Sequence, residues 1–201
     1  PFAMYHVDPD HKEREFLTLD ELTAMTEIKL EDPNMAFARD LFVFGCWTGI
    51  SFIDTKNLTE DKISMINGAP WIVSKRQKTG VPFQVKLMDI PMRIVERYKP
   101  LRKDSHLFSI GRLDTINKRI KKVAAMCGIK KRISYHVSRH TFAVLSLEYG
   151  MPIETVSKIL GHTNITTTQI YAKVTSSKLE HDISVFESRI KGHLPTMGGM
   201  A

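Results

Sequence analysis

The sequence predicts a mainly α-helical protein with one small antiparallel β-hairpin or sheet. Helix-capping signals recur along the 201 residues, and the spacing of apolar residues changes to a two-residue alternation only in the middle of the chain. The composition, 42% hydrophobic and 25% charged residues, is that of a globular domain. No apolar run is long enough to span a bilayer, and the first residues lack the pattern of a signal peptide, so we expect a soluble, cytoplasmic protein.

Capping residues mark the predicted helices in the first half of the chain. Thr18 and Glu21 form a capping box, and Asp32 with Pro33 supplies an N-cap followed by a proline at the first helical position. Gly49 is a typical helix stop. The helices expected before residue 100 cover residues 18–29, 35–47, 50–54 and 91–98.

Two strands are predicted at residues 71–78 and 81–87, joined at Thr79-Gly80. The second strand has apolar residues at every other position, which places their side chains on one face of a β-hairpin. These alternating residues are Val81, Phe83, Val85 and Leu87.

Helical signals return after the hairpin. The expected helices cover residues 114–126, 134–150, 152–160, a segment that carries Tyr171, and residues 178–190. Ser134 is expected to cap the second of these helices, Gly161 to end the third, and Thr163 or Asn164 to cap the helix with Tyr171. The last helix is amphipathic and most simply packs on its own core.

Positive charge is concentrated in one stretch of the chain. The net charge is +7, but residues 71–132 contain 17 Lys or Arg and 4 Asp or Glu, a local balance of +13 (17 minus 4). A polyanion is the natural partner for such a field, because each cation placed on a phosphate releases condensed counterions. A generic basic surface is the alternative interpretation of the charge alone.

The two cysteines, Cys46 and Cys127, lie in separate apolar segments without CxxC spacing. This arrangement argues against a disulfide framework and against a zinc site. We interpret both as buried, unreactive thiols and expect no metal site.

Several residues that could bind and attack a phosphate follow the basic stretch. His136 and Arg139 are three residues apart on one predicted helix, so their side chains can converge on one anion, with His140 on the same side. His162 follows the predicted helix stop, and this break allows it to face the same pocket as Tyr171; on an unbroken helix the nine intervening steps would turn about 900° and separate them. Taken alone, the first pair could be a surface pair and Tyr171 a half-buried aromatic residue.

Residues 134–173 resemble the catalytic core of the tyrosine recombinases, also called phage-type integrases. The resemblance extends upstream to residues 77–80 and 48–50 and covers about residues 18–190 of the chain. The combined motif is specific although each of its parts is weak. The motif residues are His136, Arg139, His140, Leu160, Gly161, His162 and Tyr171.

The resemblance implies a fold, a reaction and roles for individual residues. The fold would be the DNA breaking-rejoining catalytic domain, and Tyr171 would be the nucleophile that forms a 3′-phosphotyrosyl intermediate without a metal or nucleotide cofactor. Arg139 and His162 would hold the non-bridging phosphate oxygens, and His136 would help to manage the tyrosine proton. Lys78 would be the general acid for the departing 5′-oxygen.

One position departs from the family pattern. Where the family has a first arginine, this chain has Ser51, as in integrases of Bacteroides-type conjugative transposons, which the surrounding residues also resemble. Losing one guanidinium should be severe unless another replaces it. Arg76 is our candidate, because in a strand it would share a face with Lys78; the alternatives are a solvated strand residue or a plain backbone-phosphate contact. Arg39 is the competing candidate.

The resemblance also implies partners and domain limits. The expected partner is double-stranded DNA at attachment sites, bound by a homotetramer that is monomeric without DNA, together with accessory DNA-bending proteins and without a membrane. Residues 1–17 would be a linker from a core-binding domain, residues 175–190 a helix that could dock in trans, and residues 191–201 a flexible tail. The expected DNA contacts are Lys75, Arg76, Lys118, Lys121, Lys122 and His140.

The leading functional hypothesis is a recombinase or integrase that integrates or excises a mobile element. A DNA-binding module that has the fold but impaired catalysis is an alternative that Ser51 makes conceivable. A type IB topoisomerase-like activity, which shares the chemistry but needs no partner site, is the third.

Overall fold

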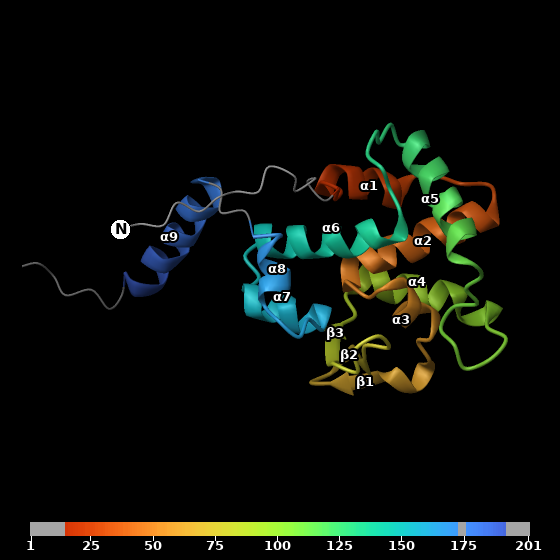
Figure 1. Ribbon diagram of the computed structural model, residues 1–201, viewed down its shortest axis with the longest axis horizontal. Helices are drawn as coiled ribbons and strands as arrows, with labels where there is room; N and C mark the ends of the chain where they lie inside the picture. The colour runs from red at the N-terminus through yellow and green to blue at the C-terminus, as the bar shows by residue number, and fades with distance from the viewer. Residues whose placement is uncertain (1–14, 173–175, 192–201) are drawn as a thin grey trace, which may run out of the picture.

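The computed structural model describes residues 15–172 and 176–191 and is mainly helical with one small sheet (Figure 1). The helices are α1 (Leu19–Glu27), α2 (Pro33–Thr48), α3 (Phe52–Lys56), α4 (Asp89–Tyr98), α5 (Leu113–Met126), α6 (Tyr135–Glu148), α7 (Ile153–Leu160), α8 (Thr166–Gln169) and α9 (Ser176–Ile190). The strands are β1 (Ile63–Ile66), β2 (Ala69–Lys75) and β3 (Pro82–Lys86), and Glu60–Lys62 and Lys99–Leu101 form short 3-10 helices. The sheet lies at the lower end of the molecule in Figure 1, below α6.

Helix α2 is the centre of the fold. It packs against α1, α4, α5 and α6, and every residue from 38 to 46 is buried. A helix that is covered on all sides needs an almost continuous apolar sequence, which explains the run in this segment. Its ends follow the predicted signals: Asp32 accepts a hydrogen bond from the backbone N–H of Asn34 at 2.8 Å, and Gly49 has a left-handed φ of 66°.

Helices α2 and α6 approach each other closely at Gly45. A β-carbon at this position would lie 2.3 Å from the hydroxyl oxygen of Ser138 on α6, so only glycine fits. This close approach brings the C-terminal end of α2, at Gly49, within reach of Arg139 on α6.

The sheet is antiparallel in the order β1-β2-β3. The predicted hairpin is present as β2 and β3, and the alternation in the second strand is confirmed, since Phe83, Val85 and Leu87 are buried. The sequence analysis missed β1. The first strand of the hairpin also ends earlier than predicted, at Lys75, because the chain turns between residues 76 and 81.

The helix predictions hold with small shifts of their ends. The capping box at α1 is confirmed, with Glu21 N–H donating to Thr18 Oγ1 at 3.2 Å and Thr18 N–H donating to Glu21 Oε2 at 2.8 Å. Ser134 is the N-cap residue of α6, but its side chain makes no capping bond. The helix that was predicted to carry Tyr171 is shorter, because α8 ends at Gln169.

Two smaller predictions need correction. Leu17, which was assigned to a linker, is fully buried and its N–H donates to Thr141 Oγ1 at 2.9 Å, so the folded domain begins before residue 18. Cys46 is buried as predicted, but Cys127 is only half-buried. Burial raises the pKa of both thiols, which keeps them protonated and poorly nucleophilic.

Within the described ranges, no group of histidine, cysteine and acidic side chains could hold a metal ion. The same part of the chain has no helix with the length and apolar character needed to cross a membrane.

Candidate active site

Arg139 is held where three segments meet. Its Nη1 donates to the carbonyl oxygen of Gly49 at the end of α2 at 2.7 Å, and its Nη2 donates to that of Leu160 at the end of α7 at 2.5 Å. Both acceptors are carbonyls at helix C-termini, which carry partial negative charge. The guanidinium is therefore fixed by backbone atoms rather than by a carboxylate.

Arg76 is buried in the same place, with a side chain that is 6% exposed. Its Nε donates to Leu160 O at 2.8 Å, and its Nη1 donates to Asp54 Oδ2 at 2.8 Å. Its Nη2 donates to Ile159 O at 3.2 Å and to Gly49 O at 3.5 Å. Arg76 therefore leaves the end of β2 and reaches the junction of α2, α3 and α7.

Arg76 and Arg139 share two acceptors, the carbonyls of Gly49 and Leu160. The structure thus brings together the two guanidinium groups that the sequence analysis paired. The route differs from the predicted one: Arg76 lies beyond the end of β2, so it does not share a strand face with Lys78.

The two guanidinium groups are electrostatically unfavourable neighbours. Burial, followed by the charge of Arg76, lowers the pKa of Arg139 to about 9, while Tyr171 and Asp54 oppose this effect. Since that value is well above neutral pH, Arg139 remains charged. Among the described residues, Asp54 is the only carboxylate hydrogen-bonded to either arginine. Two positive charges and one negative charge leave a net positive site that an anion would stabilise.

The absence of a side chain at Gly161 leaves room for the side chain of Arg76. Gly161 has a left-handed φ of +61°, and a β-carbon there would lie 2.8 Å from both Cγ and Nε of Arg76. The glycine therefore meets two needs at once, the turn after α7 and the close approach of the arginine.

Gly161→Ala is expected to lower the free energy of unfolding by more than the backbone strain alone, which is about 1–2 kcal/mol for a non-glycine residue in this conformation. Gly150→Ala is the matched control, because Gly150 has a φ of +86° and nothing within 4 Å of a β-carbon. Urea unfolding of both variants measures the difference. Equal losses would show that the Arg76 contact adds nothing.

Three rings form a chain beside Arg139. His136 and His140 on α6 pack edge to face with ring centroids 4.4 Å apart, and the ring of Tyr171 lies 5.5 Å from that of His140. His136 is exposed, whereas Tyr171 is half-buried. The rings of His140 on α6 and Tyr171 after α8 are thus neighbours. That the break at Gly161 lets His162 face the same pocket as Tyr171 stays a prediction.

His162 lies in the turn after that break. Its backbone N–H donates to Ser157 O at 3.1 Å, and its Nδ1 is 2.8 Å from Oγ1 of Thr168, which is fully buried on α8. The hydroxyl helps to fix the orientation of the imidazole ring.

His140 is not the DNA-contacting residue that we expected. Its side chain is buried, with 7% of the residue exposed, and it packs between the rings of His136 and Tyr171. A side chain in this position offers little surface to a DNA strand.

Arg39 is also placed away from the pocket. Its Nη1 donates to three carbonyl oxygens at the end of α1, and its Nε donates to Asp40 Oδ1 at 2.6 Å. The three acceptors are Met25, Thr26 and Ile28. Arg39 therefore caps α1 and joins it to α2, which excludes it from the role of a replacement phosphate ligand.

Asp54 is the site residue that the sequence analysis did not assign. Its Oδ2 accepts bonds from the Ser51 hydroxyl at 2.6 Å and from Arg76, and its Oδ1 accepts the N–H of Gln77 at 2.9 Å. Burial alone would raise the pKa of Asp54, but these three donors outweigh it and hold the pKa below its ordinary value. The carboxylate is therefore charged at neutral pH. Ser51 itself caps α3.

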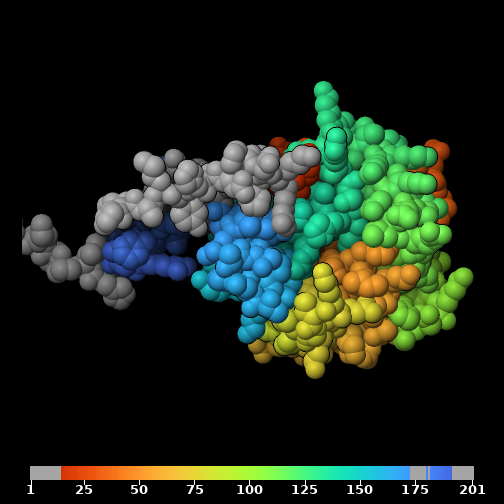
Figure 2. Space-filling view, in the orientation of Figure 1, coloured from red at the N-terminus to blue at the C-terminus, as the bar shows by residue number. Residues whose placement is uncertain are grey.

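The other predicted lysines lie on the surface. The turn between β2 and β3 (yellow) is exposed beside the segment that contains α8 (blue), as Figure 2 shows. The exposed lysines are Lys75 and Lys78 on the hairpin and Lys118, Lys121 and Lys122 on α5. Their contacts with DNA remain predictions.

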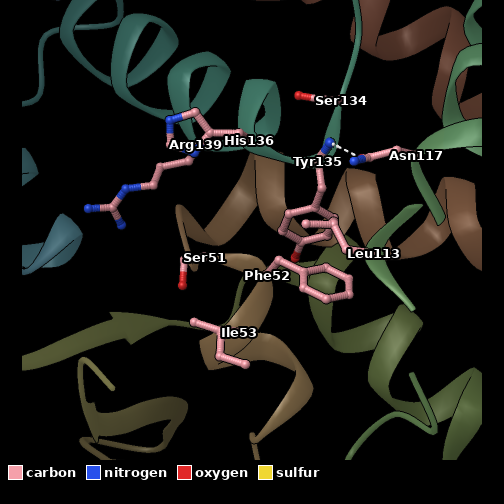
Figure 3. Close-up of a pocket in the computed structure, with 9 residues that line it drawn as sticks. All are labelled: Ser51, Phe52, Ile53, Leu113, Asn117, Ser134, Tyr135, His136 and Arg139. Carbon is pink, nitrogen blue, oxygen red and sulfur yellow. Dashed lines mark hydrogen bonds between the residues drawn. The ribbon is translucent and has the colours of Figure 1, made fainter. Parts of the chain in front are cut away.

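A cavity of about 440 Å³ adjoins Arg139 (Figure 3). Figure 3 shows the Arg139 side chain extending from α6 on one side and the rings of Phe52 and Tyr135 on the other. The backbone N–H of Tyr135 donates to Asn117 Oδ1 of α5 at 2.8 Å. The cavity thus connects the arginine with the basic helix α5. Its remaining lining residues are Ser51, Ile53, Leu113, Ser134 and His136.

Comparisons with known proteins identify relatives of the chain. Residues 15–178 match the phage integrase family. The chain is 26% identical over 192 residues to the tyrosine recombinase XerD of Oceanobacillus iheyensis, covering 87% of this chain and 64% of that protein. It is 47% identical over 60 residues to a tyrosine recombinase of Pseudothermotoga lettingae, covering 30% of this chain and 21% of that protein. The chain therefore spans only part of the length of these relatives.

Solved structures share the fold. The XerH site-specific recombinase bound to palindromic difH substrate superposes with a TM-score of 0.71 at 21% identity, covering 88% of this chain and 54% of that one. The Tn1549 transposon integrase in complex with circular intermediate DNA superposes with a TM-score of 0.69 at 18% identity, covering 88% and 67%.

Proposed function

The chain belongs to the phage integrase family, and on that basis we propose that it is the catalytic part of a site-specific DNA recombinase or integrase. The proposed reaction cleaves and rejoins DNA through a 3′-phosphotyrosyl intermediate. The proposed role is the integration or excision of a mobile element. The solved Tn1549 transposon integrase, which shares the fold, supports this assignment.

The single observation that carries the proposal is the pair of guanidinium groups beside a tyrosine. Arg139 and Arg76 share the carbonyls of Gly49 and Leu160, and the ring of Tyr171 lies 5.5 Å from that of His140, the residue after Arg139 on α6. A phosphodiester placed here would neutralise the excess positive charge of the site. As charge builds on the non-bridging oxygens in the transition state, fixed donors stabilise it without reorganisation.

Each step has a candidate group. The phenol oxygen of Tyr171 attacks phosphorus, the P–O5′ bond breaks, and the electron pair leaves with the 5′-oxygen. Lys78 supplies the proton that the leaving oxygen needs, and His136 assists with the phenol proton. His162 donates to a non-bridging oxygen. Reversal of these steps by another 5′-hydroxyl rejoins the strand, so no nucleotide cofactor is required.

Double-stranded DNA is the proposed partner. The XerH and Tn1549 structures contain DNA, and helix α5 of this chain presents exposed lysines. We propose a homotetramer on DNA, a monomer without it, help from accessory DNA-bending proteins, and a cytoplasmic location. The expected linker covers residues 1–17 and the expected tail residues 191–201; of these, residues 1–14 and 192–201 lie outside the described residues.

Helix α9 is the proposed contact between protomers. Ile183 and Phe186, three residues apart on α9, are 49% and 60% exposed. Docking on a neighbouring protomer would cover them. Sedimentation of the chain with and without DNA tests this: stable tetramers without DNA would contradict the proposal.

Trapping on nicked DNA tests the reaction. A duplex that carries a candidate attachment site and a nick just 3′ of the scissile phosphate loses its short 5′-hydroxyl fragment after cleavage, so a covalent adduct accumulates. We expect a detergent-resistant adduct that retains a label at the 5′ end of the cleaved strand. An adduct that retains only a 3′-end label, or DNA binding without an adduct, would contradict the proposed function.

A further inference from the structure

Lys78 stands on an exposed turn, and a general acid on such a turn must be held in place. Productive proton transfer requires the catalytic group to be within about 0.5 Å of its working position, and a shift of about 1 Å can cost about a hundredfold in rate. Lys78, Thr79 and Gly80 are all exposed. Something other than burial has to fix this segment.

The base of the turn is closed by backbone hydrogen bonds at Arg76. Its N–H donates to Val81 O at 2.8 Å, and its carbonyl accepts the N–H of Gly80 at 2.7 Å. These bonds define the loop of residues 76–81. They do not tie the loop to the part of the protein that holds Arg139.

The Arg76 side chain anchors the base of the loop through Leu160 O and Asp54 Oδ2. Two further bonds hold the next residue, Gln77, which precedes Lys78. The backbone N–H of Gln77 donates to Asp54 Oδ1 at 2.9 Å, and the side-chain Oε1 of Gln77 accepts a hydrogen bond from Nδ2 of Asn57. Asp54 lies within α3 and Asn57 is its C-cap residue. Helix α3 and its C-cap residue therefore hold both the backbone and the side chain of Gln77 by hydrogen bonds.

Helix α3, which holds Gln77, is itself bonded to the candidate active site. The other carboxylate oxygen of Asp54 accepts bonds from Arg76 and from the Ser51 hydroxyl. The backbone N–H of Asn57 donates to Ile53 O at 3.1 Å. The position of the turn is thus coupled to the position of the guanidinium groups.

We propose that Gln77, held by Asn57 and Asp54, is a positioning residue that fixes Lys78 for proton transfer to the leaving 5′-oxygen. This inference rests on the proposed function and adds Gln77 to the residues that support the proposed active site. Asp54 also holds Arg76, so a change there would disturb two groups at once. The side chain of Gln77 bonds only to Asn57 among the described residues, which makes it the cleaner probe.

A substrate that needs no general acid isolates this role. When sulfur replaces the bridging 5′-oxygen of the scissile phosphate, the leaving group is a thiolate, and a thiol pKa of about 8.5 lets it depart without a proton. Gln77→Ala and Asn57→Ala should each slow adduct formation on ordinary DNA by about tenfold to a hundredfold. Both should react normally on the sulfur-containing DNA. The double variant should be no slower than the slower single variant.

Gln84→Ala is the matched control, because Gln84 is an exposed glutamine on β3 of the same hairpin and none of the described contacts hold its side chain. It should react like the unmodified chain on both substrates. An equal loss for Gln77→Ala on both substrates, or no loss on either, would overturn the proposal.

A second measurement separates this inference from the proposed function. Hydrogen exchange of the backbone amides of residues 77–81 in the DNA-free chain should be at least about tenfold faster in Gln77→Ala and unchanged in Gln84→Ala. Unchanged exchange in Gln77→Ala would overturn the proposed positioning role of Gln77, even if adducts form. A chain that forms no adduct would overturn the proposed function, while the exchange rates would still decide whether Gln77 fixes the turn.

Discussion

Replacement of Tyr171 by phenylalanine is expected to abolish the covalent protein–DNA adduct. The change removes only the phenol oxygen and keeps the ring that packs 5.5 Å from His140. Loss of a nucleophile typically lowers the rate by about 10⁴-fold or more, since no other group can form the same bond. Adduct formation on nicked DNA, resolved on a denaturing gel, measures the effect.

Two controls make the Tyr171→Phe result interpretable. DNA binding by the variant, measured by gel mobility, should match that of the unmodified chain. Tyr149→Phe should leave the reaction rate unchanged, because Tyr149 is 67% exposed at the end of α6. An adduct that persists in Tyr171→Phe would show that another residue is the nucleophile.

Replacement of Arg76 by alanine is expected to slow cleavage by about 10²–10³-fold, the usual cost of removing one transition-state donor. In our proposal Arg76, which bonds to Leu160 O and Asp54, supplies the second guanidinium, because Ser51 stands where the resemblance implies an arginine. The variant also leaves Asp54 buried without its cation, which costs about 3–5 kcal/mol of stability. Rates should therefore be measured at low temperature and expressed per folded molecule.

Arg39→Ala is the comparison variant for Arg76. It also removes a buried arginine that pairs with an aspartate, Asp40, and should lower stability by a similar amount. Its rate per folded molecule should stay close to that of the unmodified chain, because Arg39 caps α1 rather than the phosphate pocket. A cleavage defect confined to Arg39→Ala would reverse the two assignments.

The parts of the fold that could be predicted from the sequence depend on local signals. The capping box at Thr18 and the glycine stops at Gly49 and Gly161 act within a few residues, and all three are confirmed. Strand β1 was missed although Asn67-Gly68 is a typical two-residue hairpin turn, with φ values of 50° and 75°. Residues 63–66 gave no strand signal, because β1 is an edge strand in which apolar and polar residues do not clearly alternate.

The candidate site was predictable where a motif fixes the spacing and unpredictable where distant segments meet. His136 and His140 are neighbours because they lie four residues apart on α6, and the ring of His140 in turn contacts that of Tyr171. The shared carbonyls that bring Arg76 beside Arg139 belong to the ends of α2 and α7, which no local pattern relates to residue 76. The strand argument for Arg76 was therefore wrong, although Arg76 does lie beside Arg139, and its role as the replacement for the first arginine stays a prediction.

We infer that Arg76 supplies the positive charge that Ser51 does not. Cleavage of DNA with a methylphosphonate at the scissile position tests it, because a methyl group replaces one charged non-bridging oxygen. If Arg76 neutralises that charge, the loss of about 10²–10³-fold in Arg76→Ala should shrink to about tenfold or less on the methylphosphonate. An equal loss on both substrates would contradict the claim and leave Arg76 with a structural role.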